Sequence, residues 1–347
     1  MDGRLRRHGR RPVPVLDRPL RSRGQEREPR NRDEGASGMS RTRNERGQVV
    51  VLTVIALTVL LGMSALVLDV GAWFHSKRQL QATADASALA GAQMLPDTPG
   101  TAISTALDYA NKNGGAVAGG DVTITSTNVG NDTISVAAKK QEPGFFARVF
   151  GLNVVDVGAK ATALVGITDQ AKYVAPMVVD CDHDLIKNCN NNGKKPEFNK
   201  QTTLNYDPMG APGAFGMLNL DGGGGTPGSS EESQWILHGF DKYLPVNQNY
   251  RSDPGAKFSS QNIRDALDAR VNTVLLFPVY QTLNGQGQNA EYYIIGWIGF
   301  YLQSYEVHGN NATLTGYFTE YIAQGILASS GGGGPPNYGV KSIQLIG

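Results

Sequence analysis

The segment richest in potential cation ligands runs from Asp180 into a stretch of asparagines. Its oxygen-bearing side chains stand at alternate positions, as in calcium-binding loops, and belong to Asp180, Asp182, Asp184, Asn188 and Asn190 to Asn192. The segment lacks the glycine at the sixth position and the closing glutamate of an EF-hand. Two interpretations of residues 180–193 therefore stay open: a calcium-binding loop, and a polar surface loop beside a disulfide.

The chain has two cysteines, Cys181 and Cys189, and both lie in this segment. If this part of the chain is outside the cytoplasm, where disulfides persist, the pair is expected to close a short loop. The chain-entropy estimate gives such a loop about 2–3 kcal/mol of stabilisation. Two free thiols are the alternative, whereas a zinc site would need more closely spaced cysteines and two further ligands.

Residue patterns typical of enzymes are missing from the sequence. The five histidines are far apart, and none belongs to an H-E-x-x-H pair. They are His8, His75, His183, His238 and His308. Gly222 to Gly225 have no following Lys-Ser/Thr, which excludes a P-loop. The adjacent Glu231 and Glu232 are expected at the start of a helix, where the helix dipole favours acids. We therefore predict a protein that is not an enzyme, with no catalytic, cofactor-binding or metal-binding residue.

The element that must position everything else is an uncharged apolar run, Val49 to Leu68. A helix of about 20 apolar residues crosses the roughly 30 Å core of a bilayer. A cleaved signal peptide usually has a shorter apolar region and a small-residue cleavage site directly after it. Arginines precede the run, so the positive-inside rule predicts a cytoplasmic N-terminus and an extracytoplasmic chain beyond Asp69. We expect a single-pass protein of the cell membrane.

Residues 1–46 form an Arg-rich arm that is expected to be disordered and cytoplasmic, because it has too few large apolar residues to build a core. Met39 opens a complete short basic leader, and we expect the true start of the protein there. Residues 1–38 hold 11 arginines against six acids, whereas the whole chain has a net charge of +1. The remainder, at +1 − 5 = −4, has no basic signature for nucleic acid.

The membrane helix is expected to continue beyond the apolar run. No proline interrupts Val70 to Met94, and Pro96 then ends the helix. Residues 47–95 thus form a transmembrane and extended helix, a rod of about 70 Å. Ala84, Ala88 and Ala92 make a small-residue face, which suits either a partner helix or packing under the protein's own domain. Asp69 is either a contact that pairs with a neighbouring subunit or sets the anchor depth, or a simple interfacial residue.

The rest of the chain reads as two extracytoplasmic domains. The pattern of residues 96–168 predicts a long helix on a small antiparallel sheet. Its expected elements are a helix at 101–113, a hairpin from DVTITSTN and DTISVAAK, a short helix at 144–150 and a strand from 154 to 165. Residues 169–347 are richer in strands and glycine. Their apolar segment 292–307 predicts a strand covered on both faces, with a bulge or close approach at Gly296 and Gly299.

The segment from Arg46 to Ala92 joins RGQ, an uncharged run, DVG, RQLQ and ADASALAGA in that order. It resembles the N-terminal segment of TadE/TadG-like proteins of the tight-adherence (Flp) pilus-assembly system. PGFFARVFGLNVVDVGAKATALV also resembles that family. The resemblance implies a single-pass membrane protein of pilin-like architecture that acts as a minor pilin or an assembly factor. Processed prepilins carry Glu at the fifth position after the cleaved glycine, where this chain has Leu52. This departure favours the uncleaved, TadG-like branch.

Together these features predict an α+β fold: a single-pass helix that continues into a long pilin-like helix, a pilin-like α+β domain at 96–168 and a β-rich domain at 169–347. The expected function is structural, in Flp pilus assembly. The expected partners are the lipid bilayer and pilin or assembly proteins that contact the helix 47–95; self-association stays open.

Two other classes of function remain open. One is a membrane-tethered module that binds calcium or cell-wall glycan. Exposed aromatic side chains in a groove near Trp235, Tyr243 and Tyr250 would favour it. The other is an extracytoplasmic hydrolase, which a cleft containing buried carboxylates with perturbed pKa values would favour.

Overall fold

The structure is a computed structural model that describes residues 45–190, 192, 194–210, 213–223, 225–255, 257–327 and 335–346. The predicted Arg-rich arm lies outside these residues as far as position 44, and so does the expected start at Met39.

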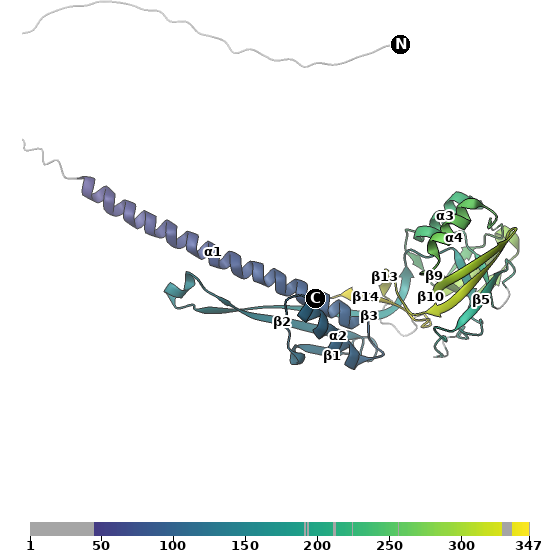
Figure 1. The fold of residues 1–347 in the computed structure, drawn as a ribbon, viewed down its shortest axis with the longest axis horizontal. Helices are drawn as coiled ribbons and strands as arrows, with labels where there is room; N and C mark the ends of the chain where they lie inside the picture. Colours follow the sequence, from purple (N-terminus) through teal and green to yellow (C-terminus); the bar gives the residue numbers. More distant parts are fainter. Residues whose placement is uncertain are drawn as a thin grey trace, which may run out of the picture. The chain divides into compact units, whose positions relative to one another are not determined.

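Helix α1, Glu45–Ala92, is continuous over 48 residues (Figure 1). Among the described residues it is the one helix long and apolar enough to cross a membrane, on length and composition alone. The large apolar side chains of its first half are exposed, for example Val49 at 61 % and Leu68 at 63 %. The predicted helix is confirmed. It ends three residues before Leu95, because the chain tightens through bonds from the N–H groups of Met94 and Leu95 to the carbonyls of Gly91 and Ala92.

A small sheet follows the helix. The 14-residue α2 (Pro99–Lys112) leads to β1 (Val122–Thr125) and β2 (Thr133–Pro143), which form the predicted antiparallel hairpin. Asn131, with φ of +59°, lies in the turn between them. A 3-10 helix, Ala147–Phe150, connects β2 to β3 (Val154–Ala171), and the two strands pair from Thr133 with Leu164 to Pro143 with Val154.

The second half of α1 packs on this sheet. Its buried residues share a core with α2, β2 and β3; from the helix the core takes Leu80, Ala84, Ala88 and Ala92. A Cβ at Gly91 would lie 2.8 Å from the carbonyl oxygen of Ala102, so the two helices are in close contact there. The small-residue face is therefore covered by the protein's own domain. The alternative, that Ala84, Ala88 and Ala92 contact a partner helix, is wrong for this structure because these three residues are fully buried.

Strand β3 extends six residues beyond its predicted end and connects the two regions of the chain. The last strand, β14 (Val340–Leu345), pairs antiparallel with β3, and β12 (Tyr321–Ile322) pairs with β14. β13 (Gly325–Leu327) and β7 (Leu244–Pro245) pair with the end of β3. The division at residue 168 remains a prediction, and β14 shows that the sheet next to α1 includes a strand from the far end of the chain.

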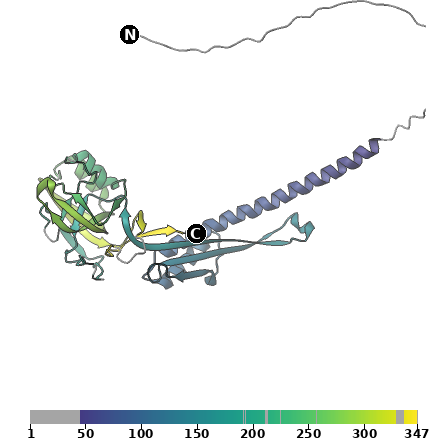
Figure 2. The same ribbon diagram turned by 180° about the vertical axis from the view of Figure 1, so that it is seen from behind.

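The second sheet has the order β11-β5-β6-β4-β9-β10-β8. Figure 2 shows this region from the other side, in green and yellow. Its strands are β4 (Met177–Asp180), β5 (Gln201–Tyr206), β6 (Ala214–Met217), β8 (Gln248–Arg251), β9 (Thr273–Asn284), β10 (Glu291–His308) and β11 (Asn311–Thr319). Because β10 also pairs with β11, six of these strands form a closed circuit. Two helices, α3 (Ser229–His238) and α4 (Gln261–Arg270), pack against each other beside it. The α+β fold with a β-rich C-terminal region is confirmed.

The middle of β10 is buried on both faces, as predicted. Ile298 and Phe300 belong to one apolar core, whereas Ile294 and Trp297 belong to another. The expected close approach at the glycines is also present. A Cβ at Gly296 would overlap the ring of Tyr338, and the pairing register shifts beside this residue.

Candidate interface at the end of the apolar helix

Asp69 is the first residue after the apolar run, and its side chain is buried, with 1 % of the residue exposed. Its carboxylate accepts hydrogen bonds from the backbone N–H groups of Phe145 at 3.2 Å, Phe146 at 2.9 Å and Ala147 at 2.6 Å. These amides begin the 3-10 helix between β2 and β3, where a negative charge is favourable. Both sequence interpretations of Asp69 missed this contact, because it joins residues more than 70 positions apart.

Two further side chains on the same face of α1 contact the hairpin. The indole Nε1 of Trp73 donates to the carbonyl of Pro143 at 3.5 Å, and Ser76 Oγ donates to Glu142 Oε1 at 2.6 Å. Lys140 also pairs with Glu142 at 2.8 Å. The contacts with Lys140 and Ser76 hold the pKa of Glu142 below its usual value. Positions 69, 73 and 76 lie one above another on a helix. The contacts therefore fix the hairpin lengthwise along α1.

We call residues 144–153 the hairpin tip. Its backbone is internally bonded: Gly144 N–H donates to Asn153 O at 3.0 Å and Leu152 N–H donates to Ala147 O at 3.1 Å. Two glycines permit this turn. Gly151 has a φ of +85°, and a Cβ at Gly144 would overlap the carbonyl oxygen of Leu152.

The side chains of the hairpin tip are unusual for a loop in water. Five of its apolar residues are exposed: Phe145 at 68 %, Phe146 at 46 %, Val149 at 84 %, Phe150 at 78 % and Leu152 at 53 %. Contiguous exposed apolar side chains on an ordered segment indicate a binding surface. The sequence predicted a short helix here, but it could not show that the apolar side chains point outward.

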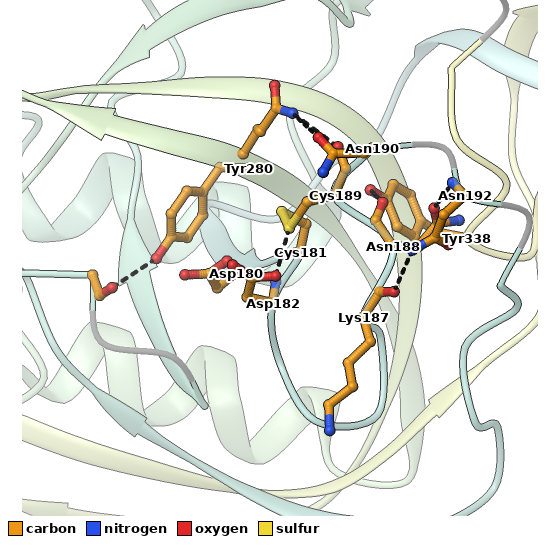
Figure 3. The surroundings of a disulfide bond; sticks show 12 residues. Asp180, Cys181, Asp182, Lys187, Asn188, Cys189, Asn190, Asn192, Tyr280 and Tyr338 are labelled. Atoms are coloured by element: carbon orange, nitrogen blue, oxygen red, sulfur yellow. Dashed lines mark hydrogen bonds between the residues drawn. A yellow bond between two sulfur atoms is a disulfide. The ribbon is translucent and has the colours of Figure 1, made fainter.

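The predicted disulfide between Cys181 and Cys189 is present (Figure 3). One group of potential metal ligands was found among the described residues, and it consists of Asp180 and these two cysteines. Sulfur atoms joined in a disulfide are not the thiolates that bind metals. The pair therefore does not supply ligands in this structure.

Several polar atoms of the described residues in this loop bond within the loop, and Asn190 Oδ1 accepts from Gln281 of β9 at 3.3 Å (Figure 3). Asp180 accepts the N–H of Asp182 at 2.8 Å, and Asn188 Oδ1 accepts the N–H of Asn192 at 2.9 Å. Asp184, with an 88 % exposed side chain, pairs with Lys187 at 2.9 Å. These contacts favour the polar surface loop over the calcium-binding loop. Asn191 and Gly193 lie outside the described residues.

A buried charged cluster joins α3 to the segment before α4. Lys257 Nζ lies 2.8 Å from Glu232 Oε1 and 3.3 Å from Asp253 Oδ2. Burial and the neighbouring Asp253 raise the pKa of Glu232 to about 8, against the opposing effect of Lys257. Glu231 and Glu232 do lie in the first turn of α3, as predicted. The helix dipole alone does not account for Glu232, which is buried and paired.

Glu232 does not line the cavity nearest to it in the sequence. A cavity of about 290 Å³ between α3 and α4 is lined by Ser230, Ser233, Gln234, Leu237 and four residues of α4, and Glu232 is not among its lining residues. The aromatic side chains proposed for glycan binding do not form an exposed group, because Trp235 and Tyr250 both pack on one apolar core. Trp235 is 7 % exposed and packs edge-on against Phe240, while Tyr250 donates to the carbonyl of Pro245 at 2.7 Å. Tyr243 alone of the three is well exposed, at 43 %.

A second charged cluster holds the chain just after α1. Asp97 pairs with Lys195 at 2.7 Å and with Lys341 of β14 at 2.6 Å. Lys341 also donates to the carbonyl of Leu95 at 3.3 Å. The two lysines, Lys195 first, hold the pKa of Asp97 below its usual value. No local pattern indicated this cluster, because its members come from three distant segments.

Residues 47–94 match the family model described as putative Flp pilus-assembly TadE/G-like. This match bears out the resemblance found in the sequence, and its family is described by pilus assembly rather than by an enzymatic activity. No curated protein and no solved structure matches the chain.

Proposed function

We propose, from the family match of residues 47–94, that this chain is a single-pass, membrane-anchored structural component of Flp pilus assembly whose bulk is extracytoplasmic. The observation that carries the proposal is α1 itself. One continuous helix has an exposed apolar first half of bilayer length and a second half that forms part of the core of a folded domain. Such a helix contains both an apolar segment of bilayer length and a segment that belongs to the domain that follows it.

Two observations support the orientation. Arg41, Arg43 and Arg46 precede the apolar run, which favours a cytoplasmic N-terminus. The disulfide between Cys181 and Cys189 is of a kind that persists outside the cytoplasm.

The burial of α1 supports a partner contact in its apolar half. Residues 80–92 present their small-residue face to the protein's own sheet, so that face is not free for a pilin helix. The apolar side chains between Val49 and Leu68 are exposed and are available to lipid and to another transmembrane helix. Leu52, in place of the glutamate of processed prepilins, supports an assembly factor that remains in the membrane.

The test is complementation of cells that lack this chain. Full-length protein should restore surface pili, remain in the membrane fraction and be absent from sheared fibres. A variant in which residues 49–68 are replaced by an unrelated transmembrane sequence of equal length should reach the membrane in equal amount but fail to restore pili. Unchanged piliation without the chain would refute the function, and full rescue by the replacement variant would refute the helix contact.

Deleting residues 169–347 would be a poor test of the role of the C-terminal region in piliation. The deletion removes β14, which pairs with β3 from Ala163 to Ile167, and it removes Lys341, which binds Asp97. Damage to the sheet beside α1 would then be mistaken for loss of the C-terminal domain's own role.

A further inference from the structure

We propose that the hairpin tip is a second membrane contact, whose exposed apolar side chains enter the interfacial layer of the bilayer that α1 spans. The proposal rests on the membrane anchoring proposed above. It assigns a lipid-binding role to residues 144–153, which are outside the transmembrane helix and outside the segment that matches the family.

The position of the tip is set by Asp69. The apolar run Val49 to Leu68 has a length of about 30 Å as a helix, which equals the thickness of the hydrocarbon core. Asp69 therefore marks the level at which the helix leaves the hydrocarbon. Its carboxylate holds the N–H groups of Phe145, Phe146 and Ala147, so the tip lies at that same level.

The composition of the tip suits the membrane interface. Aromatic side chains gather where hydrocarbon meets headgroups, and the tip exposes three of them, Phe145, Phe146 and Phe150. Arg148 is its one charged residue. It is exposed, as are Lys77 and Arg78 on α1, and these cations match anionic lipid headgroups.

The backbone hydrogen bonds of the tip also favour contact with lipid. Its backbone amides are bonded to one another and to Asp69, so its apolar side chains are held outward in a fixed arrangement. The tip is attached at Asp69, the residue directly after the exposed apolar side chains of α1, so a bilayer around those side chains ends next to the tip. Phe74, five residues beyond Asp69 on α1, is a further exposed aromatic side chain, at 62 %.

The test uses full-length protein in vesicles of phosphatidylcholine and phosphatidylglycerol, at no more than one protein per vesicle. Phe150→Trp places a fluorophore at the tip, and Tyr243→Trp is the matched control at an exposed aromatic position far along the chain. The added emission of each variant is measured against the parent, which has three tryptophans. Lipids brominated on the acyl chain and aqueous acrylamide serve as the two quenchers.

The tryptophan at position 150 should show blue-shifted emission that brominated lipid quenches and acrylamide does not. The tryptophan at position 243 should show no blue shift, and acrylamide should quench it whereas brominated lipid should not. Adding Asp69→Ala to Phe150→Trp should reduce lipid quenching, because the tip is then released from the helix. As a second readout, wild-type protein is placed in vesicles that contain a lipid with a photoactivatable acyl chain. Irradiation should give lipid adducts on the peptide that contains residues 144–154.

Acrylamide quenching at position 150 equal to that at 243, together with no adducts at the tip, would overturn the proposal. Lipid quenching that appears only when several copies share a vesicle would overturn it too, because the tip would then bind a second copy. Failure of the anchoring itself is distinguishable: the protein would not float with the vesicles, whereas a wrong assignment of the tip leaves it membrane-bound with the tip in water.

Discussion

Replacing Asp69 should release the hairpin tip from α1 while the rest of the fold remains. The carboxylate accepts three backbone N–H groups at 3.2, 2.9 and 2.6 Å. Hydrogen bonds to a charged group contribute about 1.5–3 kcal/mol each, and a buried donor left unpaired costs about 1–3 kcal/mol. Phe145 and Phe146 are exposed residues whose amides regain water on release, whereas the amide of Ala147 is buried. We therefore expect Asp69→Ala to destabilise the attachment by about 2–3 kcal/mol.

The assay is hydrogen exchange of the amides of residues 145–147, measured by mass spectrometry on full-length protein. At about 1.4 kcal/mol per factor of ten, Asp69→Ala should speed their exchange about 30- to 150-fold. Asp69→Asn keeps one acceptor oxygen and loses the charge, so it should cost about 1 kcal/mol and speed exchange about fivefold. Asn also keeps a polar residue at the end of the apolar run, which separates loss of the contact from a change in the length of that run.

The matched control is Asp85→Ala on the same helix, where the carboxylate accepts a bond from Gln81 Nε2 at 2.7 Å. It should leave exchange at 145–147 unchanged. If Asp69→Ala speeds exchange there no more than Asp85→Ala does, the carboxylate does not hold the tip and the reasoning fails.

Three further predictions concern residues beyond α1. Asp97→Asn should lower the free energy of unfolding in urea at pH 7 by no more than about 1 kcal/mol, because the pairs with Lys195 and Lys341 are partly screened. The lowered pKa of Asp97 makes this contribution present above about pH 4 and lost below it, so an equal difference at pH 3 would contradict the assignment. Glu232→Gln should flatten the pH dependence of the urea midpoint. The raised pKa of Glu232, about 8, makes wild-type stability fall as pH rises from about 4.5 through 8, and equal slopes between pH 6 and 9 would be evidence against this. Replacing both Cys181 and Cys189 by serine should cost about 2.5 kcal/mol for the short loop, and reduction of the wild type is the control; no change in midpoint would show that the loop is not held by the disulfide.

The sequence predicted the elements well where local pattern decides structure. The apolar run and the proline-free stretch after it predicted α1, and the alternation in residues 121–139 predicted the β1–β2 hairpin. The disulfide followed from two cysteines in one loop. Contacts between distant segments were not predictable in this way. Nothing near Asp69 indicates that its partners are the amides of residues 145–147, and β14 gives no sign that it pairs with β3 rather than with the strands before it.

The same limit applies to the candidate interface. The sequence predicted a short helix at 144–150, but apolar residues such as Phe145, Phe146 and Phe150 do not by themselves indicate which side chains face the core. In the structure two glycines and the carboxylate of Asp69 fix the turn so that Ala147 alone faces inward. The alanines of α1 were compatible with a partner helix and with the protein's own sheet. Only the position of β2 and β3 decides between them.

The length of β3 bears on how this protein carries mechanical load. A force between the membrane anchor and the C-terminal region enters at Asp69 on α1 and leaves through Ala171 at the end of β3. Between these points α1 and the β2–β3 hairpin overlap lengthwise, from the tip at Asp69 to the core at Ala92. Tension therefore shears this overlap along its length, and the contacts on it must fail together rather than peel apart in sequence.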